Sequence, residues 1–127
     1  MALRFPRAAR LLKPGDFAAL RRNAKRIHGT AFHLEYQPTD ASLARLGMAV
    51  SRRVSKRAVV RNRIRRTIRE SFRLNLPTLP ACDILVVART AAAEQTRAAL
   101  RAELDVLWKK LAPLKPDSAP VTMRAGS

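Results

Sequence analysis

Six guanidinium groups fall within thirteen positions, because residues 61–73 read Arg-Asn-Arg-Ile-Arg-Arg-Thr-Ile-Arg-Glu-Ser-Phe-Arg. A guanidinium group is planar, stays charged near neutral pH and presents paired N–H donors that match two oxygens of one phosphate. The chemistry that this segment offers is therefore the binding of phosphate groups. Its single acid, Glu70, neutralises little of the charge.

Placed on a helix at about 100° per residue, the segment separates into two ridges. Ile64, Ile68 and Phe72 form a narrow apolar ridge. The adjacent ridge is cationic and consists of Arg65, Arg69 and Arg73, flanked by Asn62 and Arg66. Like charges four residues apart destabilise an isolated helix by about 0.2–0.5 kcal/mol per pair. A solvated face normally mixes charges of both signs, so this one is expected to bind an anionic partner.

The whole chain of 127 residues carries 26 Lys and Arg against 9 Asp and Glu, a formal charge of +17. Twenty of the basic residues are arginines, and residues 52–73 hold ten basic residues with one acid. A basic stripe on a basic background indicates a nucleic-acid-binding protein. A membrane-surface helix would need a wider apolar face, so no membrane partner is expected.

Residues suited to catalysis or metal binding are not grouped in this sequence. The acids are scattered singly, with no paired carboxylates, His pair or His-Lys-acid set at hydrolytic spacing. His28 and His33 are predicted to be surface or edge-strand residues, with contact to RNA as the alternative. Cys82 is the single cysteine, which excludes a disulfide within the chain, and it is predicted to be a small buried hydrophobe.

Hydrophobic patterns predict the elements that position the arginine helix. Pro14 is suited to the start of a short helix that runs to about Lys25, with Phe17 and Leu20 on its apolar side. Residues 31–37 and 45–51 alternate apolar and polar, which predicts two half-buried strands. Their larger apolar residues are Phe32, Leu34 and Tyr36 in the first strand and Leu46, Met48 and Val50 in the second.

The second half of the chain predicts two more elements after the arginine helix. Pro77 and Pro80 end that helix at about Leu74. The apolar run 84–88 predicts a central strand. Residues 94–112 predict an amphipathic helix in which Trp108 is a core residue rather than a platform for stacked bases.

The predicted fold is α+β: a single-domain α/β sandwich with one small sheet and packed helices, in the order α-β-β-(β)-α-β-α. The optional short strand lies near residues 26–29. The domain covers residues 1–112, and 113–127, with three prolines and few apolar side chains, is expected to be a disordered tail. The generic expectation for a crossover through the arginine helix is right-handed. No apolar run reaches the length of a signal-peptide core, so the chain is expected to be cytoplasmic.

Residues 46–72 closely resemble the protein subunit of bacterial ribonuclease P. Arg61-Asn62-Arg63, followed by Arg66 and Arg69, carries the resemblance. Further matches are Phe5-Pro6, Arg10-Leu11-Leu12, Asp16-Phe17, the strand at 83–88 and Leu107-Trp108-Lys109-Lys110, so that about residues 4–112 are covered.

This resemblance implies that the chain is the non-catalytic protein subunit of an endoribonuclease. Its partners would be the catalytic RNA of ribonuclease P and precursor tRNA, with no obligatory protein partner evident. The holoenzyme would remove the 5′ leader of precursor tRNA by hydrolysis assisted by Mg²⁺, which the RNA mainly holds. The family's fold also implies an unusual left-handed crossover through the basic helix, against the generic expectation.

The resemblance implies two binding surfaces and no catalytic residue. The surface for the catalytic RNA would consist of Arg52, Arg53, Lys56, Arg57, Arg61, Asn62, Arg63, Arg65, Arg66 and Arg69. A cleft for the single-stranded leader would consist of Phe17, Arg21, Phe32, Tyr36, Val50 and Ser51. Many family members have an aromatic residue where Leu20 and Arg21 stand. Aromatic stacking would suit leaders of varied sequence, and plain core packing is the alternative for these aromatics.

Three other functions were considered for a chain with such a basic helix. A structural ribosomal-RNA-binding protein would use the same surface and would co-sediment with ribosomal subunits. A DNA-binding protein is less compatible, because only Asn62 on the exposed face suits base edges. A stand-alone nuclease would need a cluster of acids that the sequence lacks.

Overall fold

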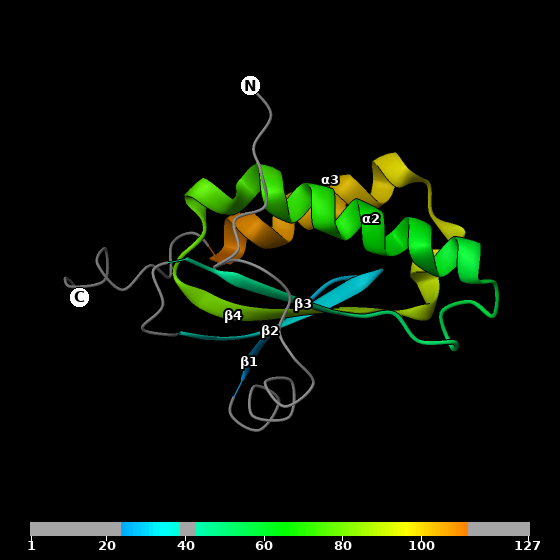
Figure 1. Cartoon of the computed structure of the whole chain (residues 1–127), viewed down its shortest axis with the longest axis horizontal. Coiled ribbons are helices and arrows are strands. Elements are labelled where there is room, and N and C mark those ends of the chain that lie inside the picture. The colour runs from blue at the N-terminus through cyan, green and yellow to red at the C-terminus, as the bar shows by residue number, and fades with distance from the viewer. Residues whose placement is uncertain (1–23, 39–42, 112–127) are drawn as a thin grey trace.

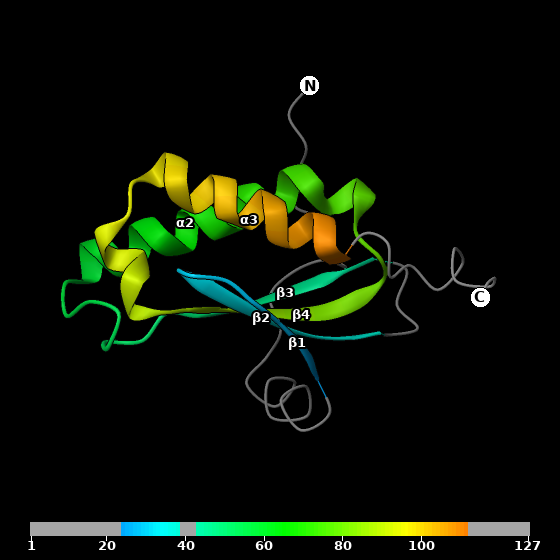
Figure 2. The same ribbon diagram turned by 180° about the vertical axis from the view of Figure 1, so that it is seen from behind.

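A computed structural model of the chain describes residues 24–38 and 43–111. The strands of these residues are β1 (Lys25–His28), β2 (Phe32–Pro38), β3 (Arg45–Ala49) and β4 (Cys82–Ala88). The helices are α2 (Ala58–Asn75) and α3 (Arg97–Leu111), with short 3₁₀ helices η2 (Leu76–Thr78) and η3 (Thr90–Glu94). Both α2 and α3 lie on the same side of one sheet (Figures 1 and 2). None of the helices in these two ranges is long and apolar enough to cross a membrane.

The four strands form one sheet in the order β1-β2-β4-β3. β2 pairs antiparallel with β1 and with β4, whereas β3 pairs parallel with β4. The connection between the two parallel strands passes through α2, so β3, α2 and β4 form a βαβ unit, and the expected crossover through the arginine helix is confirmed. β4 has a neighbour on each side, as the apolar run 84–88 predicted. The hand of the crossover stays a prediction.

Alternation along the strands gives the sheet two different faces. Leu34 and Met48 both pair with Val86, so these side chains share the face that α2 and α3 cover. Phe32 and Tyr36 belong to the same face because they lie two residues from Leu34. The opposite face has its own small cluster, in which Leu85 is fully buried and packs against Ala24, Ala49 and Val87.

The apolar ridge of α2 packs on the core as its spacing predicted. Ile64, Ile68 and Phe72 have no exposed surface. The Phe72 ring meets the Trp108 ring of α3 edge to face, with centroids 5.9 Å apart. The Trp108 indole N–H donates to the Ser71 hydroxyl at 2.8 Å, so a buried polar group is satisfied at the same place. Trp108 is 1% exposed and is the core residue that the sequence predicted.

Two predicted boundaries in the first half of the chain were wrong, near the first strand and at β3. Lys25 does not end a helix: it begins β1, where its backbone pairs with that of Tyr36. Pairing with β2 supplies hydrogen bonds that the local helical pattern at 14–25 does not reveal. This strand confirms the optional element near residues 26–29. β3 ends at Ala49, two residues before the predicted end. The rest of the predicted first helix, residues 14–23, and the predicted tail, 113–127, lie outside the described residues.

The last helix begins later than its pattern predicted. Residues 90–94 form η3, and α3 starts at Arg97 rather than near Glu94. The Thr96 hydroxyl accepts the N–H of Ala99 at 3.1 Å, which is the usual N-cap interaction and sets the start of the helix.

A carboxylate on α3 holds the turn between β1 and β2. Glu103 accepts the backbone N–H groups of Ala31 and Phe32, each at 2.9 Å. Gly29 stands close to this carboxylate, because a Cβ added there would lie 2.5 Å from Glu103 Oε2. The turn therefore joins the sheet to α3 at a position where glycine leaves room for the carboxylate.

The reactivity of the Cys82 thiol tests whether the start of β4 is buried. Burial raises the pKa of this thiol from 9.0 to about 12, and the adjacent Asp83 carboxylate adds to the shift. Because the thiolate is the nucleophile, we expect iodoacetamide to modify the folded protein at least roughly tenfold more slowly than the urea-unfolded protein. The raised pKa also means that the free energy of unfolding falls as pH rises between about 9 and about 12. Timed alkylation followed by mass spectrometry measures the rate, and equal rates in both states would contradict the burial of Cys82.

Candidate nucleic-acid interface

The arginines of α2 lie on the side of the helix that faces away from the core. Arg63, Arg66 and Arg69 are exposed, as is Asn62. The other arginines of this helix are partly buried and are Arg61, Arg65 and Arg73. Glu70 is 3.4 Å from the guanidinium group of Arg97 on α3, a partner that the helical pattern did not reveal. The acid is therefore paired with the neighbouring helix.

A basic loop, residues 50–57, connects β3 to α2 and continues the cationic surface. Val54 is 6% exposed and anchors this loop in the core. The Val54 N–H donates to the Ser51 carbonyl at 3.0 Å, which closes a tight turn. The cationic side chains of the loop are exposed, and these are Arg52, Arg53, Lys56 and Arg57. One apolar anchor thus fixes a loop whose long cationic side chains point to solvent.

Two hollows on this surface are lined by cationic side chains. The larger, about 470 Å³, is lined by Arg52, Arg53 and Lys56 and is called the loop hollow below. The smaller, about 240 Å³, lies along α2 and is lined by Arg66, Arg69, Glu70 and Arg73. Guanidinium groups at the rim of a hollow hold phosphate oxygens with several donors at once. Both hollows are therefore suited to the phosphates of a nucleic acid.

Two arginines of α2 turn back to the basic loop. Arg61 Nη1 donates to the carbonyl oxygens of Ser55 at 2.9 Å and Lys56 at 3.0 Å. Arg65 Nη2 donates to the Val50 carbonyl at 3.2 Å, while its Nη1 donates to the Asn62 side chain at 3.1 Å. The sequence predicted both as RNA-facing residues and gave no sign of these contacts.

Two residues of the predicted leader cleft lie in the core. Phe32 has no exposed surface and Val50 is 5% exposed, and both belong to the core under the helices. The burial of Phe32 favours the alternative stated for the cleft aromatics, core packing, because strand alternation turns this ring toward α2 and α3. Tyr36 is half-buried against the same core, and Ser51 is exposed. Phe17 and Arg21 lie outside the described residues.

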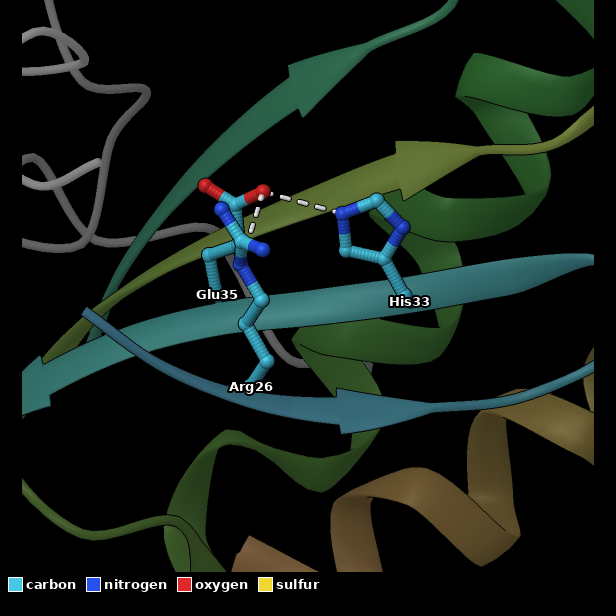
Figure 3. Close-up of polar contacts among 3 residues, drawn as sticks. All are labelled: Arg26, His33 and Glu35. Atoms are coloured by element: carbon cyan, nitrogen blue, oxygen red, sulfur yellow. Dashed lines mark hydrogen bonds and ion pairs between the residues drawn. The ribbon is translucent and has the colours of Figure 1, made fainter.

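A separate polar cluster lies on the other face of the sheet (Figure 3). The Glu35 side chain is 1% exposed and lies 2.9 Å from His33 Nε2 and 3.8 Å from Arg26 Nε. The predicted exposure of His28 on an edge strand is confirmed. His33 is instead partly buried on β2, an internal strand, because its ring is turned to the Glu35 carboxylate. Alternating polar positions in β2 were the only signal of this cluster in the sequence.

Among residues 24–38 and 43–111, no group of three or more His, Cys, Asp or Glu side chains could hold a metal ion. The described part of the site therefore offers cationic donors and no set of metal ligands. A single sheet covered on one side by two helices, with arginines along the exposed side of one of them, defines a basic α+β protein whose cationic surface is suited to the phosphates of a nucleic acid.

The chain belongs to the ribonuclease P protein family, because the family model described as Ribonuclease P matches residues 5–112. It is 41% identical over 113 residues to the ribonuclease P protein component of Idiomarina loihiensis, covering 87% of this chain and 90% of that one. It is 40% identical over 108 residues to the same component of Legionella pneumophila, covering 85% and 93%.

Solved structures of the family share the fold. The ribonuclease P protein of Staphylococcus aureus matches with a TM-score of 0.76 and 29% identity, covering 80% of this chain and 94% of that one. The ribonuclease P protein of Thermotoga maritima matches with a TM-score of 0.69 and 27% identity, covering 87% and 96%. The α+β fold predicted from the sequence is confirmed by these similarities.

Proposed function

We propose that this chain is the protein subunit of ribonuclease P and binds the RNA subunit that carries the active site. The holoenzyme removes the 5′ leader of precursor tRNA, in the cytoplasm. The observation that carries the proposal is the continuous cationic surface of the basic loop and α2. That arginine surface consists of Arg52, Arg53, Lys56, Arg57, Arg61, Asn62, Arg63, Arg65, Arg66 and Arg69.

The physical role of this surface is electrostatic. Two RNAs that must meet repel each other through their phosphates, and cations placed between them lower that repulsion. Arginine suits the task because its planar group holds two phosphate oxygens in a defined geometry. The described residues offer no group of metal ligands, which supports a division of labour in which the RNA mainly holds Mg²⁺. The protein then contributes affinity and orientation.

We further propose that the leader of precursor tRNA contacts the protein beside the basic loop. Ser51 supports this position because it is exposed where β3 leads into the loop. Phe17, Arg21 and Tyr36 stay candidate leader contacts, whereas Phe32 and Val50 are left in the core. Because mature tRNA lacks a leader, such contacts add affinity for the precursor alone. The higher affinity for precursor tRNA favours substrate binding, and the lower affinity for mature tRNA favours product release.

Reconstitution tests the proposed function. Protein purified free of RNA is expected to leave precursor tRNA intact even with Mg²⁺. Addition of ribonuclease P RNA should give accurate cleavage at the 5′ end of the mature tRNA, at Mg²⁺ concentrations too low for the RNA to act alone. Gel analysis of end-labelled precursor reads out the site of cleavage. Cleavage by the RNA-free protein, or no effect of the protein on the RNA's activity, would contradict the proposal.

A further inference from the structure

The basic loop is held by α2 in an unusual way. The N-cap residue of α2, Arg57, makes no side-chain capping hydrogen bond, and the first turn contains no acid. The start of the helix therefore lacks the two features that commonly fix the preceding chain. Arg61 and Arg65, one and two turns into the helix, instead bind carbonyl oxygens of the loop.

These contacts hold both ends of the loop hollow. Arg65 binds the carbonyl of Val50, just before the hollow, and Arg61 binds the carbonyls of Ser55 and Lys56 at its far end. Between these points the chain carries the cations that line the hollow, which are Arg52, Arg53 and Lys56. Three like charges this close repel one another, and an unrestrained loop would separate them. Guanidinium donors make the bonds to the carbonyls stronger than neutral donors would.

We propose that Arg61 and Arg65 are positioning residues, which hold the basic loop so that the loop hollow is formed before RNA arrives. This inference rests on the proposed RNA-binding function and assigns different tasks within the arginine surface. Arg52, Arg53 and Lys56 contact phosphates, while Arg61 and Arg65 contact the protein backbone. Ordering the loop in advance removes an entropy cost from the binding step, which raises affinity without adding a phosphate contact.

Salt dependence separates positioning from direct contact. Removal of one bond to a phosphate lowers the slope of log affinity against log salt by about 0.7–0.9. A residue that only orders the loop changes the affinity and leaves the number of phosphates bound in the complex, and hence the slope, unchanged. Amide hydrogen exchange in the free protein gives a second readout, because a loosened loop exchanges faster whether or not RNA is present.

The test compares Arg61→Ala with Arg66→Ala. Each variant removes one cation from α2, but the Arg66 side chain is exposed and has no hydrogen-bond partner among the described residues, which makes it a matched control. For Arg61→Ala we expect about five- to tenfold weaker binding of ribonuclease P RNA with an unchanged slope. Exchange at amides 52–57 should rise about tenfold while β4 amides stay protected. For Arg66→Ala we expect the slope to fall by about 0.7–0.9 with unchanged loop exchange.

A fall in slope for Arg61→Ala equal to that of Arg66→Ala, with unchanged loop exchange, would overturn the inference. If Arg61→Ala melts at a much lower temperature than the wild type, its loop exchange cannot be interpreted, and Arg61→Lys is used instead. This variant keeps the charge but loses the planar guanidinium group. Faster loop exchange in the lysine variant supports positioning, and wild-type exchange contradicts it. If the wild-type protein binds no ribonuclease P RNA, the proposed function fails, while exchange in the free variants still decides whether Arg61 holds the loop.

Discussion

Replacement of Phe72 by alanine is expected to lower the free energy of unfolding by about 3–5 kcal/mol. Phe72 has no exposed surface and its ring packs edge to face on Trp108, so truncation removes a buried ring and leaves a space between α2, α3 and the sheet. The neighbouring helices and sheet can fill that space only in part, because the Trp108 indole is also held by its bond to Ser71. Urea denaturation followed by circular dichroism measures the loss.

Val59→Ala is the control for Phe72→Ala. Val59 lies on the same helix but is 63% exposed, so its replacement should change the free energy of unfolding by no more than about 0.5 kcal/mol. If Phe72→Ala is as stable as the control, the orientation of α2 is wrong and the arginines would not face away from the core. The stability measurement thus also tests which side of α2 is available to RNA.

The largest loss of RNA affinity is expected when Arg52, Arg53 and Lys56 are replaced together by alanine. These side chains line the loop hollow and are exposed, so the fold should be retained. Each bond from a charged donor contributes about 1.5–3 kcal/mol, so removal of three such bonds should weaken binding on the order of a thousandfold or more. The slope of log affinity against log salt should fall by about 2–3. Binding of ribonuclease P RNA across a salt series measures both quantities.

A second triple variant controls for total charge. Arg101, Lys109 and Lys110 are exposed on α3, so replacing them by alanine removes the same three charges from a different helix. We expect a change in slope of less than about 1 for this variant. Equal losses in the two triple variants would mean that RNA responds to the net charge of the protein, and the loop hollow would have no special role.

The buried sides of the helices and strands were predictable wherever apolar residues recur at a regular spacing. The spacing of Ile64, Ile68 and Phe72 predicted the buried side of α2, because residues four apart share a side of any helix. The pattern of β2 likewise grouped Phe32 with Leu34 on one face. The period does not show what covers that face, so the sequence left both leader stacking and core packing open for Phe32, which α2 and α3 bury.

A hydrogen bond between a side chain and a backbone group far away in the sequence could not be predicted from a local sequence pattern. Arg61 and Arg65 looked like two more cations of a charged segment, and only the path of the loop brings carbonyl oxygens to them. Glu103 on α3 carried no signal of its role in the sequence, yet it binds the turn before β2 across 72 residues of chain. No local propensity encodes such a contact, because it depends on how the elements pack.

By itself the sequence determined the charge, the order of most elements and the apolar side of α2, since these follow from composition and from periods of two and 3.6 residues. The Arg-Asn-Arg segment in its context also pointed to the family that the comparisons show. Tertiary structure alone decided which strands pair, so that Lys25 joined a strand instead of a helix. It also decided which arginines face solvent and which hold the loop, because a long flexible side chain takes its direction from the acceptors within its reach.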